Sequence, residues 1–389
     1  MRVTDVTTLC LSRPHEPERQ WATDRDQIVK ADCAIVRVET DEGLAGHGEA
    51  CAYGSPPLIA AWVSWLRRGL VGLELDDART YATPTGRSWS YDCAVAGIDC
   101  ALWDLRGKEA GLPVSRLLAP APDLSVRVYA SGGLGYDWRA GPESLIEEVA
   151  GYAAAGFTAC KLRIGTNWGW DDVTPARFLA LMAELREAVG DELELMVDGN
   201  QRLTEAEARV VAEGLAALGF SWFEEPIPQE DVRGYARLND AAGLPITGGE
   251  QLTTAEQFRP YLEAGAFAVV QPDAGWCGIT ELLKIARLAA SYGVGLAPHS
   301  WHNGAMALAH AQVLAARPGS GPLELCMVQG PLQMEILAGG LALEAGRLWL
   351  PDAPGLGIEL ADGLEERFPY VEGDYYVTVE RRSVASERS

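Results

Sequence analysis

The stretch Leu193-Glu-Leu-Met-Val-Asp198 is a short apolar run that ends in an acidic residue, and the later run Ser221-Trp-Phe-Glu224 ends in the same way. Other apolar runs in the second half of the chain also end in ionisable side chains, and consecutive ends lie 23 to 37 residues apart. This spacing has room for one strand, one helix and two loops. The end residues are Lys161 with Arg163, Asp198, Glu224, Glu250, Asp273, His299 and Glu324.

Amphipathic stretches lie between these runs, with Leu and Ala at intervals of three and four residues; they are 177–188, 205–218, 255–264 and 279–291. Short apolar strands that alternate with helices predict a parallel (β/α) barrel. The carboxyl ends of barrel strands meet at one mouth. We therefore expect the ionisable end residues to form a single site.

The 389 residues exceed the roughly 250 of one barrel, so a second domain is expected. We predict a smaller α+β domain over 1–124, the barrel over 125–342 and a separate C-terminal segment over 343–389. In the first domain, strands are expected around 3–11 and 34–39, helices over 57–65 and 94–109, and loops over 13–25 and 43–49. The Pro-rich run Leu118-Ala-Pro-Ala-Pro122 is a predicted linker.

The charge and hydropathy of the chain disfavour some classes of binding partner. The net charge of -23 disfavours nucleic acid and anionic membranes, which require basic patches. No apolar run approaches the roughly 20 residues of a membrane span, and the N-terminus lacks the features of a secretory signal, so we predict a cytoplasmic protein. The eight cysteines contain no C-x-x-C pair and are expected to be buried, reduced thiols.

Three acidic strand ends predict a metal site. Asp198, Glu224 and Glu250 would sit on adjacent strands, where their unneutralised charges would repel. A hard divalent cation with oxygen ligands resolves this repulsion, and a site that keeps positions open for water and substrate suits Mg²⁺. Any one of these residues alone would most often be a solvated surface charge.

The remaining end residues suggest acid/base chemistry. Lys161 and Arg163 are two residues apart on a strand and therefore share a face, where they could bind an acid or form a buried ion pair. Asp273 could orient His299 as a general base, although a core histidine is the alternative. His302 is either a second acid or the start of the next helix.

The ordered set of motifs resembles the enolase superfamily, and within it the mandelate racemase subgroup of acid-sugar dehydratases and racemases. The resemblance spans nearly the whole chain. It rests on Ala94-Val-Ala-Gly-Ile-Asp-Cys-Ala-Leu-Trp-Asp104, Cys160-Lys-Leu-Arg163, Val197-Asp-Gly-Asn200, Phe223-Glu-Glu-Pro226, Gly248-Gly-Glu250, Gln271-Pro-Asp273, Pro298-His299 and Leu323-Glu324.

The resemblance implies a modified (β/α)₇β barrel under an α+β capping domain to which the C-terminal residues return. It implies Mg²⁺ on the three carboxylates and Lys161 as the cation beside the substrate carboxylate. It also implies Asp273 with His299 as the acid/base dyad, Glu324 as a hydrogen-bonding electrophile, and a homo-oligomer.

Arg163 departs from the family pattern, because racemases and many relatives carry Lys at this position. Arginine is a poor base at neutral pH. Racemisation needs a base on each face of the α-carbon, whereas β-elimination can run with one. We therefore predict a Mg²⁺-dependent dehydratase that converts an aldonate or aldarate into a 2-keto-3-deoxy acid. The alternatives are a racemase, epimerase or cycloisomerase of the same superfamily, and a non-catalytic metal-dependent binder of sugar acids.

The resemblance implies that substrate specificity lies in two loops of the capping domain and in the loop after the second barrel strand. Arginines there could meet a distal carboxylate, and aromatic residues could cover a sugar face, although packing or solvated surface is the competing interpretation for each. The candidate substrate-binding residues are Asn200, His302, Arg13, Arg19, Trp21, Tyr53 and Trp168.

Overall fold

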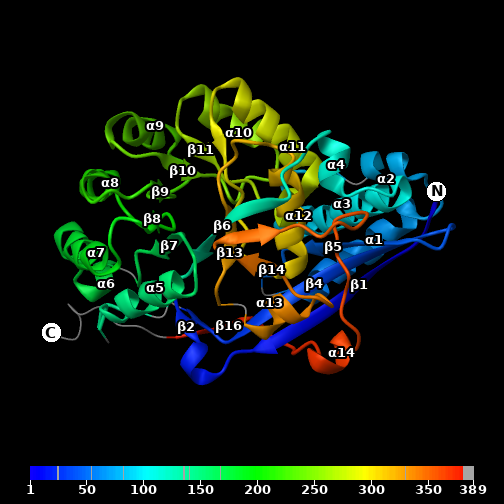
Figure 1. Cartoon of the computed structure of the whole chain (residues 1–389), viewed down its shortest axis with the longest axis horizontal. Helices are drawn as coiled ribbons and strands as arrows, with labels where there is room; N and C mark the ends of the chain where they lie inside the picture. The colour runs from blue at the N-terminus through cyan, green and yellow to red at the C-terminus, as the bar shows by residue number, and fades with distance from the viewer. Residues whose placement is uncertain are drawn as a thin grey trace.

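The computed structural model describes residues 1–23, 26–53, 55–81, 83–134, 136–139, 141–166, 168–328 and 330–379. Figure 1 shows a barrel ringed by helices, coloured green to yellow, with the blue strands and cyan helices of an N-terminal domain beside it. The predicted fold, a barrel with a capping domain, is confirmed.

Eight parallel strands form the barrel. Strands β6 to β12 pair in chain order, and β13 pairs in parallel with β6, with Glu324 opposite Tyr129. The amide of Gly321, just before β13, donates to the carbonyl of Leu296 in β12 at 2.7 Å. The bounds are β6 Ser125–Ser131, β7 Ala159–Arg163, β8 Glu194–Asp198, β9 Trp222–Glu224, β10 Ile246–Gly248, β11 Val269–Val270, β12 Gly295–Leu296 and β13 Leu323–Cys326.

A helix follows each of the first seven barrel strands, which gives the predicted (β/α)₇β order. These helices are α5 Ser144–Ala154, α7 Pro175–Val189 (after the short α6, Trp168–Asp171), α8 Glu205–Ala217, α9 Val232–Ala241, α10 Ala255–Glu263, α11 Ala274–Ser291 and α12 Gly304–Ala315. Each packs an apolar face on the strands, as α7 does with Phe178, Leu181, Met182 and Leu185. Capping boxes at Thr204 and Thr254 begin α8 and α10.

The capping domain packs helices on an antiparallel sheet of order β1-β4-β5. A second small sheet joins β2, β3 and the C-terminal strand β16, so the chain end returns to this domain as expected. The bounds are β1 Val3–Pro14, the 3-10 helix Pro17–Arg19, β2 Trp21–Ala22, β3 Asp26–Ile28, β4 Lys30–Thr40, β5 Ala45–Ala50, α1 Pro56–Leu70, α2 Leu75–Tyr81, α3 Trp89–Ala110, α4 Val114–Leu118 and β16 Tyr376–Thr378. The remaining elements are α13 Pro331–Glu335, β14 Ala342–Glu344, β15 Arg347–Trp349 and α14 Leu364–Arg367.

The prediction of a loop over 43–49 was wrong, because most of these residues belong to strand β5. Its glycines allow close packing rather than a turn. A Cβ atom at Gly48 would lie 2.3 Å from the carbonyl oxygen of Gly97 in α3. The strand therefore needs glycine where the helix crosses it. The loop predicted over 13–25 likewise contains the 3-10 helix and β2.

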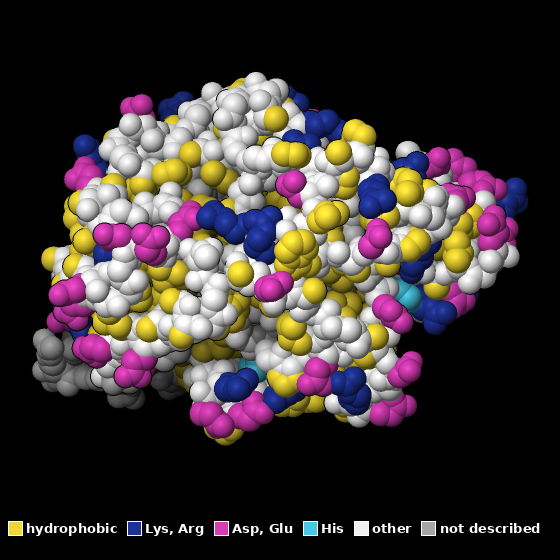
Figure 2. All heavy atoms as spheres, in the orientation of Figure 1, with side chains coloured by type: hydrophobic (Ala, Val, Ile, Leu, Met, Phe, Trp, Pro, Cys, Tyr) yellow, Lys and Arg dark blue, Asp and Glu magenta, His cyan; other side chains and the backbone are white. Residues whose placement is uncertain are grey.

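The eight cysteines, all in the described part of the chain, form no disulfide, and all except Cys10 are buried. Figure 2 shows acidic side chains over both domains on the visible face, with Lys and Arg between them. Among the helices that the structure describes, none combines the length and apolar character needed to cross a membrane.

Candidate active site

Three carboxylates converge at the mouth of the barrel. Asp198 and Glu224 end adjacent strands and lie opposite each other in the β8–β9 register, and Glu250 follows β10. Each contributes one oxygen to a group whose atoms lie within 4.8 Å of one another. The side chains of Asp198 and Glu224 are 1% exposed and that of Glu250 is 15% exposed. Buried oxygen ligands at this separation fit a hard divalent cation.

The neighbours of these carboxylates offset only part of their charge. Lys161 Nζ lies 2.5 Å from Glu224 Oε1 and 4.0 Å from Asp198 Oδ2. Asn200 donates to Asp198, and Gln271 donates to Glu224 at 2.5 Å. Burial nevertheless raises the pKa of Glu224 to about 8, against the opposing effect of Lys161. The local excess of negative charge is a second reason that these residues suit a bound cation.

Asp273 holds two histidines at once. Its Oδ2 atom lies 2.6 Å from His299 Nδ1 and 2.7 Å from His302 Nε2, while its Oδ1 accepts from the amide of Gly275 at the start of α11. Burial alone would raise the pKa of Asp273, but the two histidines hold it below its usual range. The structure thus brings together the predicted dyad and adds His302 to it.

The second ring nitrogen of His299 faces two carboxylates at the barrel mouth. Its Nε2 atom lies 3.5 Å from Glu250 Oε2 and 4.0 Å from Glu324 Oε2. Burial lowers the pKa of His299, but Glu250, Glu324 and Asp273 outweigh that effect and raise it above its ordinary value. Since Nδ1 faces Asp273, Nε2 is the atom available for proton transfer.

Glu324, in β13, is held by one hydrogen-bond donor and one ion pair. The amide of Ser300 donates to Oε2 at 2.7 Å, and Lys161 Nζ lies 2.9 Å from Oε1. Burial would raise the pKa of Glu324, but Lys161 and His299 lower it to about 2. In this structure Glu324 is therefore an ionised acceptor.

Arg163 ends β7 between two indole rings. Its guanidinium carbon lies 4.5 Å from the ring centroid of Trp301 and 5.8 Å from that of Trp21. Its Nε atom is 3.9 Å from Asp198 Oδ2. Burial would lower the pKa of Arg163, but Asp198 and Glu250 raise it, so the side chain is a permanent cation stacked on aromatic faces.

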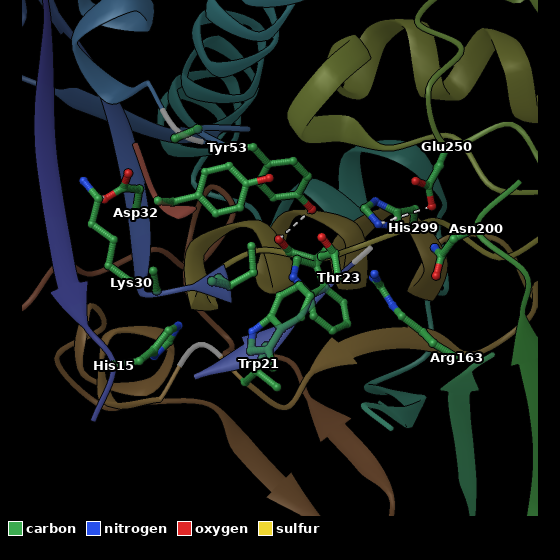
Figure 3. A pocket seen from close by; sticks show the side chains of 16 residues that line it. His15, Trp21, Thr23, Lys30, Asp32, Tyr53, Arg163, Asn200, Glu250 and His299 are labelled. Atoms are coloured by element: carbon green, nitrogen blue, oxygen red, sulfur yellow. Dashed lines mark hydrogen bonds and ion pairs between the residues drawn. The ribbon is translucent and has the colours of Figure 1, made fainter. Parts of the chain in front are cut away.

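A cavity of about 170 Å³ lies between the barrel mouth and the capping domain. Figure 3 places Arg163, Asn200, Glu250 and His299 on one side of it, and Lys30 and Asp32 on the other. The cavity is lined by His15, Trp21, Thr23, Ile28, Lys30, Ala31, Asp32, Ala52, Tyr53, Arg163, Asn200, Glu250, His299, Trp301, Val328 and Tyr375.

The predicted specificity residues divide into two groups. Trp21, Tyr53 and Asn200 line the cavity. Arg13 instead pairs with Glu16 and the carbonyl of Pro14, and Arg19 is exposed on the 3-10 helix; neither lines the cavity.

Trp168 and His302 are buried away from the cavity. The indole of Trp168 donates to the carbonyl of Ile164 at 2.9 Å and packs on Phe178. His302 stacks behind Tyr53, with ring centroids 6.0 Å apart.

Sequence reasoning missed Lys30 and Asp32 as cavity residues. Both lie in β4, whose sequence is that of an ordinary strand without a motif that marks a binding site. The available signal was that Lys30 is one of four lysines in the chain and is separated by one residue from an acid.

Comparisons with known proteins agree with this architecture. A family model described as the mandelate racemase / muconate lactonizing enzyme N-terminal domain matches residues 4–119, and one described as enolase C-terminal domain-like matches residues 144–364. The chain is 32% identical to a D-galactarolactone cycloisomerase from Agrobacterium fabrum, over 94% of this chain and 98% of the relative. It is 31% identical to an arabinonate dehydratase from Saccharolobus solfataricus and 33% identical to a D-galactonate dehydratase from Ralstonia nicotianae, in each case over 85% of this chain and 89% of the relative.

Solved structures match over nearly the full length. A member of the enolase superfamily from Polaromonas sp. JS666 has a TM-score of 0.86 at 33% identity, covering 97% of this chain and 100% of its own. The 3,6-anhydro-D-galactonate cycloisomerase from Zobellia galactanivorans has a TM-score of 0.81 at 28% identity, covering 95% and 100%. With its capping domain, its barrel and the carboxylates and histidines at its mouth, the chain belongs to the mandelate racemase/muconate lactonizing enzyme family of the enolase superfamily.

Proposed function

We propose that this protein is a Mg²⁺-dependent dehydratase of sugar acids. It removes the proton on the carbon next to the substrate carboxylate and expels the β-hydroxyl as water. The observation that carries the proposal is the position of His299. Asp273 orients its imidazole, and it lines the same cavity as Glu250, one of the three clustered carboxylates. Several relatives named as sugar-acid dehydratases support the reaction class.

Asp198, Glu224 and Glu250 would hold the cation. When bound there, Mg²⁺ draws electron density from a substrate carboxylate and so makes the neighbouring C–H bond more acidic. Arg163 supplies a fixed positive charge at the same end of the cavity. Its role is to bind and orient the acid, because it cannot exchange protons at neutral pH.

Lys161 and Glu324 act as a pair beneath the cavity. Lys161 is 1% exposed and bound to two carboxylates, so it carries its charge without reaching the cavity lining in this structure. We propose that Lys161 turns one donor toward the substrate carboxylate. Glu324, as an ionised acceptor, then keeps Lys161 in position instead of donating a proton itself.

Proton transfer runs through one imidazole. His299 Nε2 takes the α-proton, while Nδ1–H continues to donate to Asp273 Oδ2. The electron pair of the C–H bond forms the new C=C bond as the β C–O bond breaks. His302 does not line the cavity, so His299 returns the proton to the leaving hydroxyl on the same face. The resulting enol tautomerises to a 2-keto-3-deoxy acid.

Ring opening is the second candidate, favoured by the near full-length match to a D-galactarolactone cycloisomerase. If the β-oxygen belongs to a ring, the same proton abstraction and C–O cleavage open the ring without losing water. The two outcomes differ in product mass. In D₂O both products take up one deuterium when the enol tautomerises, but only the dehydratase product has lost a water; the ring-opened product keeps all the heavy atoms of its substrate.

The test is a panel of sugar acids and their lactones assayed with Mg²⁺-loaded protein for keto-acid formation. The variant His299→Asn should reduce turnover by roughly 10²- to 10⁴-fold. Unchanged thermal unfolding and Mg²⁺ binding in the variant would show that fold and metal site persist. Near-normal turnover by His299→Asn would remove the assigned base, and α-deuterium exchange without elimination would favour an epimerase.

A further inference from the structure

The cavity end opposite His299 contains a buried charged pair. Lys30 and Asp32, both in β4, have side chains 4% and 2% exposed, with Lys30 Nζ 3.2 Å from Asp32 Oδ1. Ser12 donates to that same oxygen at 2.6 Å. The second oxygen, Asp32 Oδ2, is buried and has no hydrogen-bond partner among the described residues. Figure 3 shows this pair across the cavity from Arg163 and His299.

The positive charge at this end of the cavity already has partners. Lys30 Nζ also donates to the carbonyl of Val371 at 2.5 Å and lies 4.9 Å from the ring centroid of Tyr370. His15 is neutral near pH 7, because burial and the charge of Arg13 lower its pKa. Among the described residues that line this end, the buried polar atom without a hydrogen-bond partner is thus an acceptor, Asp32 Oδ2, and the charge of Lys30 is already paired.

Three further buried polar atoms on cavity-lining residues have no hydrogen-bond partner within the described parts of the chain. They are the donors Trp21 Nε1 and Arg163 Nε and the acceptor Asn200 Oδ1. Buried polar groups are nearly always paired in native proteins, so unpaired ones in a cavity indicate a ligand that supplies the partners. Hydroxyl groups both donate and accept, and a chain of them matches this mixture.

We propose that the cavity selects sugar monoacids, with the single carboxylate at the barrel end and a neutral hydroxyl at the distal end donating to Asp32 Oδ2. This inference rests on the proposed function and names its substrate class. A second, distal carboxylate would face Asp32 without a counter-charge, since Lys30 is already paired. Aldonates and monolactones of aldaric acids meet this requirement, and open-chain aldarates do not.

The experiment is calorimetric titration of the Mg²⁺-loaded full-length protein with matched aldonate and aldarate pairs of galacto, gluco and manno configuration. For the best pair, wild type should bind the aldonate roughly 100-fold more tightly than the aldarate, given the cost of opposing like charges in a buried site. Asp32→Asn, which removes that repulsion at constant size, should shrink the ratio at least tenfold. Asp77→Asn, an exposed carboxylate of the same domain, should leave the ratio unchanged.

The wild-type ratio tests the inference even if Asp32→Asn fails to fold. Equal or tighter binding of aldarates by wild type would overturn it, as would failure of every acid in the panel to bind. An unchanged ratio in folded Asp32→Asn would remove Asp32 as the discriminating residue. Failure of the proposed function has a different signature, which is selective aldonate binding without α-deuterium exchange or product.

Discussion

The two ends of the cavity are built in different ways. At the barrel end, ionisable groups stand on successive strand ends, and most of them touch at least one other charged group. At the capping end, Lys30 and Asp32 lie side by side in one strand and are completed by the C-terminal segment through Val371 and Tyr370. In the proposed function, the barrel end transfers the proton and the capping end recognises the rest of the substrate.

The largest expected effect is that of Asp273→Asn at the barrel end. This change removes the negative charge that orients His299 and His302. We expect roughly a 10³-fold loss of kcat/KM for every acid tested, because a misoriented base fails whatever the distal end of the substrate. Steady-state kinetics would measure the loss. A loss confined to one class of acid would break the proposed division between the two ends.

His302 should affect stability in a pH-dependent way. Burial lowers its pKa, but Asp273 raises it to about 9 in the folded protein, above the ordinary histidine value of about 6.5. A raised pKa means that its contribution to stability is fully present below pH 6.5 and disappears as the pH rises through 9. His302→Gln should therefore cost about 3 kcal/mol of unfolding free energy at pH 6 and much less at pH 9.5.

Denaturant unfolding of wild type and His302→Gln at both pH values would measure this difference. His47→Gln is the matched control, because burial lowers the pKa of His47 to about 4 and places its titration in the acid range. A cost of His302→Gln that is equal at pH 6 and 9.5 would contradict the charged His302–Asp273 pair.

Arg163 should contribute mainly to binding at the barrel end. Arg163→Ala removes a cation stacked on Trp301 and should raise KM roughly 10- to 100-fold while changing kcat less. Arg163→Lys restores the charge but not the planar stacking, so a partial recovery of KM is expected. If kcat falls instead and KM is unchanged, Arg163 acts in the chemical step.

The smallest effect is expected for Arg13→Ala and Arg19→Ala, which lie outside the cavity lining. Arg13 pairs with Glu16 on the surface, and such pairs contribute at most about 1 kcal/mol to stability. KM for aldonates and aldarates should change by less than about twofold, in line with near-neutral surface substitutions. A selective loss of aldarate binding would move distal recognition from Asp32 to these arginines.

Much of the barrel could be predicted because its signal is local. Each short apolar run that ends in an ionisable residue corresponds to a strand whose end faces the mouth, from Lys161 in β7 to Glu324 in β13. Strand β5 was missed because its glycines resemble a turn when the contact with Gly97 is unknown. The domain boundaries at 124 and 342 and the homo-oligomer stay predictions.

The sequence by itself determined the fold class and predicted that three carboxylates and a histidine–aspartate pair share one barrel mouth, because strand alternation and even spacing are properties of neighbouring residues. Only the tertiary structure decided which candidates reach the cavity. Lys30 contacts Val371 across a separation of 341 residues, and Arg163 at the end of β7 contacts Trp301 in the segment that follows β12. Such contacts depend on how distant segments pack, and no local pattern records whether Arg13 points toward the substrate or toward Glu16.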